Sequence, residues 1–258
     1  MHGSSSAPPP DPRLLVESVA AIDSTNSELL RREPLLPTGS RAEAIWLVAT
    51  RQTAGRGRRQ RHWISSADAS LTASFAREVE RPAHIGALSL VAGVALAQAL
   101  EAFGAPVRLK WPNDLHVAGG KAGGILCEAR ARGNVTRLVI GCGLNLLAPS
   151  ESVGQAAGAL FDRASLPERE TLIQALGEAM LVATDRLLAD GFEPFRQAWA
   201  ARDMLLGRAI MIHDYGGDSP AIARGIDTDG ALLVSYDHEP DGLRRLIAEE
   251  VSVRPLSR

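Results

Sequence analysis

The chain has 258 residues, enough for one sizeable core and a small second domain. Its composition, 45% hydrophobic and 22% charged, is typical of a globular protein. With 28 basic and 30 acidic residues the formal net charge is −2, which excludes a general attraction to polyanions. Any cluster of arginines is therefore a local feature of the chain.

Residues 1–12, MHGSSSAPPPDP, lack the basic and then apolar segments of a secretory signal, and their serines and prolines predict a disordered tail. The longest uncharged run, Ile85–Leu100, is shorter than a membrane span. Its small and polar residues, such as Ser89 and Gln98, favour a buried helix of a soluble protein. We therefore expect no membrane association.

The two cysteines, Cys127 and Cys142, lie in the apolar stretches GILCEA and VIGCGL, and neither belongs to a CxxC pair. Two thiols without histidine or carboxylate partners do not make a zinc site. We interpret both as buried free thiols, which suits a reducing compartment and predicts a cytoplasmic protein.

Up to Arg202 the chain predicts both strands and helices. A strand begins at Arg13 and ends in a polar turn at Ser24–Asn26, whose short oxygen-bearing side chains are typical of a helix start. The elements expected next are a strand over 44–50, a strand over 69–76, a helix over 85–103, a strand over 107–111 ended by Pro112, a glycine-rich turn entering a strand over 118–132, a hairpin turn at 132–134, a strand over 135–147, and helices over 171–188 and 193–202.

After Arg202 the pattern changes to short strands over 207–214, 221–237 and 242–255, separated by glycine and aspartate turns. This pattern is typical of a small β-barrel. We therefore predict an α+β protein: a tail over 1–12, a main domain over 13–204 with a mixed sheet and helices, and a small β domain over 205–258.

The segment Gly55–Trp63, GRGRRQRHW, contains four arginines, two glycines and a tryptophan. Glycine allows the backbone to approach a ligand closely, and arginine matches the oxygens of carboxylates and phosphates. Tryptophan offers a flat face for a ring. Taken alone, the segment fits a solvated loop, a nucleic-acid contact, or a lid over a small anion.

Three further motifs favour the small anion. KWPND (Lys110–Asp114) joins a cation, an aromatic ring, a proline and two short polar residues at a strand end, although a core tryptophan before an ordinary turn has the same letters. In GGKAGGI (Gly119–Ile125), Lys121 stands between two glycine pairs, a place where a lone lysine usually faces solvent. In GCGLNL (Gly141–Leu146), Asn145 needs a hydrogen-bond partner in an apolar strand, whether structural or functional.

These four motifs, in this order, resemble those of the biotin protein ligases. The resemblance extends from about Ser24 into the C-terminal strands, where RGIDTDGALLV (224–234) is similar to that family's SH3-like domain. It implies a class II synthetase-like catalytic domain of the biotin and lipoyl ligase type, followed by a small SH3-like β-barrel.

Members of this family join biotin to ATP, giving biotinyl-5′-AMP and pyrophosphate, and then transfer biotin to a lysine of a carrier domain. Because a carboxylate must approach a polyanion, such a site needs fixed positive charge and exclusion of water. The resemblance implies biotin and ATP as substrates, Mg²⁺ with ATP, and the biotin carboxyl carrier domain of acyl-CoA carboxylase as partner. It is compatible with both a monomer and a homodimer.

Matching the family's motifs residue by residue implies two binding sets. The biotin set is Ser24, Thr25, Asn26, Gln52, Gly55, Arg56, Gly57, Arg58, Lys121 and Gly124. The ATP and adenylate set is Arg58, Arg61, Trp63, Lys110, Asn113, Lys121 and Asn145. The expected catalytic residues are Lys121, Arg58 and Arg61, which act by charge and not as nucleophiles. No carboxylate cluster identifies a metal site, and Asp114 is the candidate magnesium ligand.

Two residues depart from the family's pattern: Gln60 stands where the loop commonly has glycine, and His62 where lysine is frequent. About twelve residues precede the first strand, too few for the DNA-binding domain that some members carry, so we expect a ligase that does not bind DNA. The competing interpretations are a lipoate or octanoyl ligase-type acyltransferase, an arginine-loop nucleic-acid-binding module, and an inactive homologue.

Overall fold

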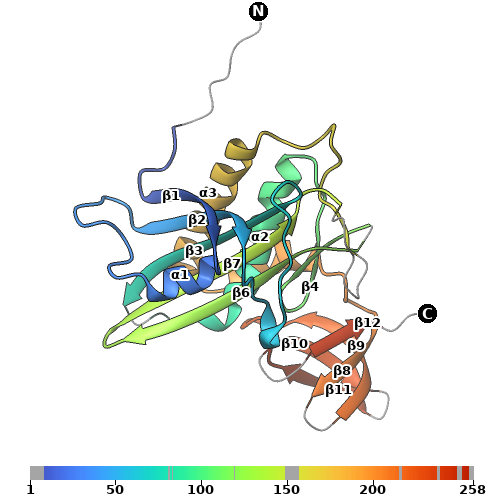
Figure 1. The fold of residues 1–258 in the computed structure, drawn as a ribbon. Helices are drawn as coiled ribbons and strands as arrows, with labels where there is room; N and C mark the ends of the chain where they lie inside the picture. The colour runs from blue at the N-terminus through green and yellow to red at the C-terminus, as the bar shows by residue number, and fades with distance from the viewer. Residues whose placement is uncertain are drawn as a thin grey trace, which may run out of the picture.

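The computed structural model describes residues 9–80, 82, 84–118, 120–148, 157–214, 217–236, 239–248 and 252–255. They form a seven-stranded mixed sheet with helices and a second, five-stranded antiparallel sheet (Figure 1). Residues 1–8 of the expected tail and Gly119 of the GGKAGGI motif lie outside the described residues.

The elements follow one another with short connections. In chain order they are β1 (Leu14–Ile22), α1 (Thr25–Arg31), β2 (Ala44–Gln52), the 3₁₀ turn η1 (Arg58–Gln60), β3 (Ser70–Glu80), the 3₁₀ turn η2 (Ile85–Ala87), α2 (Leu88–Ala102), β4 (Arg108–Lys110), β5 (Asp114–Val117), β6 (Gly120–Arg132), β7 (Val135–Asn145), α3 (Arg169–Asp190), α4 (Glu193–Ala200), β8 (Ala209–Asp214), β9 (Gly217–Ile226), β10 (Leu232–Tyr236), β11 (Glu239–Leu246) and β12 (Ser252–Pro255).

The large sheet has the strand order β1-β2-β3-β7-β6-β5-β4, and β1 and β2 are parallel while the other neighbours are antiparallel. Side chains alternate between the two faces of a strand, so each strand contributes residues to both faces of the sheet. Along β7, Leu138 and Ile140 belong to the main core with α2 and α3, whereas Val139 packs with Leu29 of α1 on the opposite face. Figure 1 shows α1 on one side of the sheet and α2 and α3 on the other.

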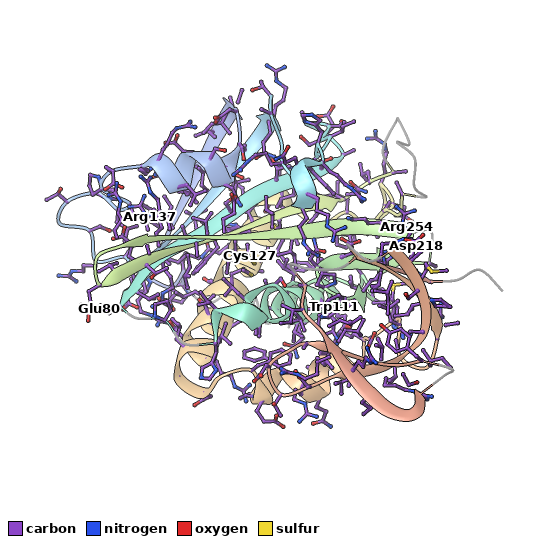
Figure 2. All side chains as sticks on the ribbon, turned by 90° about the horizontal axis from the view of Figure 1, so that it is seen from below. Glu80, Trp111, Cys127, Arg137, Asp218 and Arg254 are labelled. Atoms are coloured by element: carbon purple, nitrogen blue, oxygen red, sulfur yellow. The ribbon has the colours of Figure 1, made fainter. Side chains whose placement is uncertain are left out.

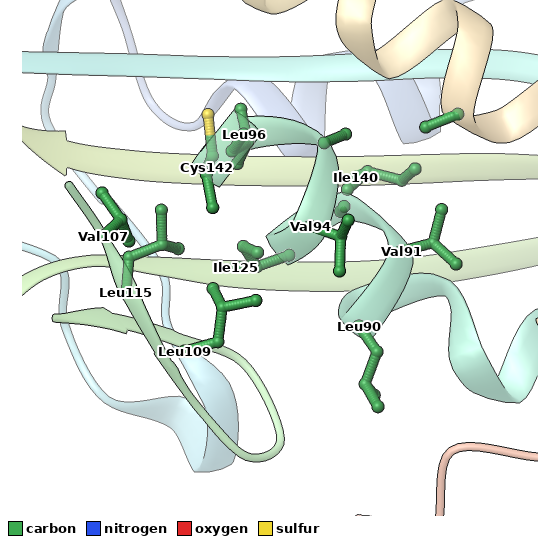
Figure 3. Close-up of a cluster of buried hydrophobic side chains, with 14 of the residues drawn as sticks. Leu90, Val91, Val94, Leu96, Val107, Leu109, Leu115, Ile125, Ile140 and Cys142 are labelled. Atoms are coloured by element: carbon green, nitrogen blue, oxygen red, sulfur yellow. The ribbon is translucent and has the colours of Figure 1, made fainter. Parts of the chain in front are cut away.

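Helix α2 is the central element of the core. Figure 3 shows its apolar side chains, among them Val94 and Leu96, lying against Ile125 of β6 and Ile140 of β7. The stretch Ile85–Ala102 is long and apolar enough to cross a membrane, but most of it is buried within the protein. That burial is typical of a core helix, and the length of the stretch is only weak support for a membrane span.

The second sheet has the strand order β11-β10-β9-β8-β12 and lies beyond β4 in Figure 1. Its buried residues Ile210, Ile212 and Val234 continue the core that contains α2. The indole Nε1 of Trp111 donates a hydrogen bond to the carbonyl of Gly230 at 3.0 Å, which joins the turn after β4 to this sheet. The two sheets therefore share one apolar core.

Most expected elements are confirmed, including the hairpin between β6 and β7, where Gly133 has a φ of +59°. The prediction of a glycine-rich turn before β6 is wrong, because the strand already begins at Gly120. Glycine at 123 serves close packing between strands: a Cβ there would lie 2.7 Å from Cδ2 of Leu144. Strand β5 was not expected, since its first residue, Asp114, belongs to a polar pair typical of a turn.

The burial of α2 predicts a large effect of one core substitution. Leu96 is fully buried against the sheet, so Leu96→Ala should lower the free energy of unfolding by about 2–5 kcal/mol. Val182 of α3 is 59% exposed, so Val182→Ala should change it by less than about 0.5 kcal/mol. Urea unfolding of the two variants makes the comparison, and equal losses would contradict this placement of α2.

Candidate functional site

A cavity of about 900 Å³ lies between the start of α1, the Gly55–Trp63 loop and the KWPND turn. Every residue of the two expected binding sets lines it except Gly55, and Asp114 lines it as well. Gly55 closes the base of the loop, where its carbonyl accepts a hydrogen bond from the Trp63 N–H at 3.0 Å. A Cβ at Gly55 would lie 2.5 Å from the Trp63 carbonyl oxygen, so the loop requires glycine at this position.

Helix α1 begins at one end of the cavity. Ser24 has extended backbone and caps the helix, because its Oγ accepts a hydrogen bond from the N–H of Ser27 at 3.4 Å. The N–H and hydroxyl of Thr25 donate to Oε1 of Gln52 at 2.8 and 3.1 Å. Ser24, Thr25 and Asn26 are all buried, so this end of the cavity offers neutral polar side chains that are shielded from water.

Asn26 is held by residues that sequence reasoning did not identify. Its Nδ2 donates to Oε2 of Glu128 at 2.8 Å and to the Leu126 carbonyl at 3.1 Å, and the Ser74 hydroxyl donates to its Oδ1 at 2.5 Å. A Cβ at Gly141 would lie 2.2 Å from that Oδ1. Glycine at 141 therefore makes the space that Asn26 occupies on the cavity floor.

The Gly55–Trp63 loop is a compact turn. The N–H of Gly57 donates to the Arg61 carbonyl at 2.7 Å, and Arg56 and His62 form an isolated β-bridge. Arg59 and Gln60 have φ of 54° and 59°, a left-handed conformation that residues other than glycine rarely adopt. Gln60, where glycine is common in the family, therefore adds strain on the order of 1 kcal/mol.

Two of the loop's arginines contact other parts of the protein. Arg56 forms an ion pair with Glu128 at 2.7 Å. Arg58 donates to Oδ1 of Asn113 at 3.3 Å and to the carbonyl of Ala248 in the C-terminal region. The loop thus connects β6, the KWPND turn and the second sheet around a single cavity.

The Trp63 indole lies against the glycines of β6 and β7. A Cβ at Gly143 would lie 2.2 Å from Cε2 of the indole, and one at Gly124 would lie 3.7 Å from its Cζ3. The indole Nε1 is buried and has no hydrogen-bond partner within the part of the chain that the structure describes. This ring supplies the cavity with a flat apolar wall.

A centre of positive charge lies beside this wall. Nζ of Lys121 is 2.7 Å from Oδ1 of Asp114, and Nζ of Lys110 is 4.0 Å from the other oxygen of the same carboxylate. Lys110 is buried, and burial, together with neighbouring cations, lowers its pKa. Because two ammonium groups share one carboxylate, the centre favours a further anion.

Two asparagines support the backbone around this centre. Asn113 donates from Nδ2 to the Ile125 carbonyl at 2.8 Å. Asn145 donates from Nδ2 to the carbonyls of Lys121 and Gly158, both at 3.3 Å. The buried amide of Asn145 is therefore satisfied within the protein while its residue lines the cavity.

The donor set does not fit a magnesium ion held by protein residues alone. The described residues contain no group of three or more His, Cys, Asp or Glu side chains arranged to hold a metal. Asp114, the candidate ligand, is already paired with two lysines. Mg²⁺ prefers oxygens of carboxylates and phosphates, so most of its ligands would have to come from a nucleotide.

Both cysteines are free thiols, as expected, but only Cys142 is buried, whereas Cys127 on β6 is half-buried. Burial raises the pKa of Cys127 and of Cys142 to about 12, so neither is a thiolate near neutral pH. Cys142 faces the core, where Figure 3 shows it beside Leu96 of α2. Neither thiol has the properties of a nucleophile.

Several functional candidates were missed by sequence reasoning. Gly141 and Gly143 carry a readable signal, since glycine at alternate positions of a strand leaves one face open. Ser74, Glu128 and Arg254 carry none, because each reaches the site only through the fold. Arg254 lines the cavity from β12, more than a hundred residues beyond the four motifs.

The environment of His116 predicts a pH dependence of stability. His116 lies on β5 two residues after Asp114, and its Nε2 is buried without a partner among the described residues. Burial, with smaller effects of Lys110 and Lys121, lowers its pKa from 6.5 to about 4. The native protein therefore keeps this ring neutral where the unfolded chain already binds a proton.

As the pH falls from 6.5 towards 4, the wild-type protein should lose unfolding free energy through this group. His116→Gln removes the titration, so its stability should fall less over the same range. Urea unfolding at pH 7, 6 and 5 measures both slopes. Parallel slopes for the two proteins would show that His116 titrates normally.

Comparisons with known proteins agree with this site. Residues 20–145 match the model of the biotin/lipoate A/B protein ligase family. The bifunctional ligase/repressor BirA of Escherichia coli is 36% identical over 228 residues, covering 86% of this chain and 70% of that protein. The biotin–acetyl-CoA-carboxylase ligase of Paracoccus denitrificans is 35% identical, covering 90% of this chain and 98% of that protein.

Among solved structures, the biotin protein ligase of Aquifex aeolicus in complex with biotin and ATP superposes with a TM-score of 0.75. It is 23% identical and covers 94% of this chain and 99% of that chain, a likeness that shows the fold. The Escherichia coli and Paracoccus denitrificans proteins are similar to this chain over most of their own length. The chain therefore belongs to the biotin/lipoate A/B protein ligase family, and within it to the biotin protein ligases.

Proposed function

We propose that the protein is an ATP-dependent biotin protein ligase that makes biotinyl-5′-AMP and transfers biotin to a lysine of a carrier domain. One observation carries the proposal: a single cavity joins a buried end, where α1 presents neutral polar side chains, to a cationic centre at Lys110 and Lys121. A neutral ring with hydrogen-bonding groups suits the first end, and phosphate and carboxylate oxygens suit the second.

The polar end takes the ureido ring of biotin. Ser24, Thr25, Asn26 and Gln52 already form an ordered network there, so few side chains lose rotational freedom when the ring binds. Gly57, Gly124 and the loop arginine Arg56 enclose the valerate chain on its way to the cationic centre. Gly55 does not line the cavity but closes the base of the loop, where its carbonyl accepts the hydrogen bond from Trp63.

The cationic end takes ATP and then the adenylate. Trp63 packs against the adenine ring, and Asn113 and Asn145 hold the backbone that surrounds it. Lys110, Lys121, Arg58 and Arg61 face the phosphates, and Mg²⁺ enters with the nucleotide. Asp114 keeps Lys121 in place until the anions arrive.

In the first step the biotin carboxylate attacks the α-phosphorus of ATP. A carboxyl oxygen–phosphorus bond forms, the bond to the β-phosphate oxygen breaks, and pyrophosphate leaves. Lys121 and Arg58 stabilise the negative charge that gathers on the phosphoryl oxygens, which is the charge that otherwise opposes the attack. No protein nucleophile takes part.

In the second step the neutral amine of a carrier lysine attacks the acyl carbon of biotinyl-5′-AMP. An amide bond forms, the acyl carbon–oxygen bond breaks, and AMP leaves with the bonding electron pair while the amine loses its proton. The loop shields the mixed anhydride from water until the carrier docks. The carrier is the biotin carboxyl carrier domain of an acyl-CoA carboxylase.

The finer architecture belongs to the same proposal. Residues 13–204 are the catalytic domain of the class II synthetase type, and residues 205–258 are an SH3-like domain. Support for this division comes from the strand orders of the two sheets. A cytoplasmic location, the absence of DNA binding and a choice between monomer and homodimer stay predictions.

Lipoate or octanoate activation is the alternative enzymatic function, because the family includes ligases for lipoate. Its substrate lacks a ureido ring and so cannot use the hydrogen-bonding groups of this buried polar end, which disfavours binding. A nucleic-acid-binding function is disfavoured because Arg56 is already paired with Glu128 and Arg58 is bonded to Asn113, so only part of the loop's charge is left for a polyanion.

Exchange of labelled pyrophosphate into ATP tests the function directly. We expect exchange that requires biotin and does not occur with lipoate, and Lys121→Ala should reduce its rate by roughly 100-fold or more. Arg208→Ala, an exposed cation outside the cavity, is the control and should leave the rate unchanged. Exchange with lipoate alone would establish the alternative, and a wild-type rate in folded Lys121→Ala would remove Lys121 from its role.

Two glycines of β7 allow the two ends of the cavity to be tested one at a time, because Gly141 lies against Asn26 and Gly143 against Trp63. Gly141→Ala should clash with Asn26 and raise the KM for biotin, while Gly143→Ala should clash with Trp63 and raise the KM for ATP. Each increase should be about tenfold or more, since the neighbouring side chain must move. Steady-state exchange kinetics measure both constants, and the reverse pairing of variant and substrate would contradict the assignment of the two ends.

A further inference from the structure

Helix α1 is too short to hold its own position. It has seven residues, and isolated helices of this length are unstable in water. Its first residues, Thr25 and Asn26, lie in the cavity, so a displacement of the helix displaces the hydrogen-bonding groups. The contacts that fix the C-terminal end of α1 therefore affect where Thr25 and Asn26 lie in the cavity.

Three arginines of the β6–β7 hairpin hold that other end. Arg137 donates from Nη1 to the carbonyl of Leu29 at 2.9 Å and also to that of Arg32. Arg130 donates to the carbonyl of Leu30 at 2.9 Å, and Arg132 pairs with Glu33 just after the helix. We call Arg130, Arg132 and Arg137 the arginine clamp.

Arg137 is the buried member of the clamp. Its side chain is only 2% exposed, and it also bonds the carboxylate of Glu78 through Nε at 3.0 Å and Nη2 at 2.6 Å. The second carboxylate, Glu33, lies 3.3 Å from Nη2. One guanidinium thus joins two carbonyls at the end of α1 to two carboxylates, which the single ammonium of lysine could not reproduce.

The clamp and the cavity lie at opposite ends of α1. Arg137 and Gly141 are on the same strand and four residues apart, so both face α1, and Val139 between them packs against Leu29. Figure 2 labels Arg137 and the cavity residue Arg254 at opposite ends of the long strands. Seven residues of helix span about 10 Å, so Arg137 does not touch a ligand in the cavity.

We propose that the arginine clamp sets the position of α1, and that Arg137 is a positioning residue for the biotin end of the cavity. The inference rests on the proposed function. Arginine suits the task because the last carbonyls of a helix are unpaired and carry partial negative charge. Leu29 is fully buried in the middle of the helix, so packing ties the clamped end of α1 to the end that lines the cavity.

The clamp acts on one substrate only. Trp63 belongs to the loop, Asn113 to the KWPND turn and Lys121 to β6, none of which α1 carries, so the ATP end should be unaffected. A general loss of structure would instead reduce the folded fraction and alter both substrates together. The ratio of the KM for biotin to the KM for ATP therefore distinguishes a displaced α1 from a general loss of stability.

The test compares Arg137→Met with Arg77→Met. Arg77 lies on β3, is 12% exposed and pairs with Asp185 of α3 on the opposite face of the sheet, without contact to α1. Both variants remove the arginine of an ion pair, from a buried side chain at 137 and from a half-buried one at 77. Arg137→Met should raise the KM for biotin about tenfold or more, with kcat and the KM for ATP within about twofold of wild type. Arg77→Met should lower stability and leave the KM for biotin unchanged.

An unchanged KM for biotin in Arg137→Met, or equal losses for biotin and ATP, would overturn the proposal. If Arg137→Met does not fold, Arg137→Lys and the exposed Arg130→Ala take its place, with smaller increases in the same constant. Hydrogen exchange at residues 25–32 gives a readout independent of activity: it should be faster in the clamp variants than in Arg77→Met. If the wild type fails to exchange pyrophosphate with biotin, the proposed function fails, and unchanged hydrogen exchange in the clamp variants alone refutes the clamp.

Discussion

Glycine at two alternate positions of β7 is the constraint on which the cavity depends. Gly141 lies beneath Asn26 and Gly143 beneath Trp63, each so close that a Cβ would lie 2.2 Å from a side-chain atom. The residues between and beside them, such as Cys142 and Leu144, face the core with α2. One strand therefore serves as the wall of the core on one face and the floor of the cavity on the other. Larger residues at 141 and 143 would keep the core and close the cavity.

The centre of the cavity carries an excess of positive charge that is unfavourable in the free protein and that an anionic ligand neutralises. Lys110 and Lys121 share the single carboxylate of Asp114, and burial disfavours the charged form of Lys110. Incoming phosphate and carboxylate oxygens would supply the missing negative charge. The same low-dielectric surroundings that make this centre costly for folding strengthen its interaction with the anions of the reaction.

The cavity is assembled from segments that are fixed outside it. Trp111 of the KWPND turn bonds Gly230 in the second sheet, and Arg58 of the loop bonds Ala248 beyond β11. The C-terminal strands thus hold two of the motifs, in the way that the β6–β7 hairpin holds the far end of α1. Strain in the loop at Gln60 is tolerated because these outside contacts keep the loop in place.

The sequence by itself determined the features of this protein that depend on residues close together in the chain. The helix start at Ser24, the hairpin at Gly133 and the cationic and glycine-rich motifs are contiguous patterns whose meaning depends on neighbours along the chain. Because these motifs resemble those of the biotin protein ligases, the site residues could be named from the sequence, and the cavity gathers them from five separate stretches. Only the tertiary structure decided that Gly120–Gly124 is strand, that Glu128 and Ser74 hold Asn26, and that Arg137 meets a helix end 108 residues away. Pairing between distant strands makes these contacts, and no local pattern in the chain encodes which strands will be neighbours.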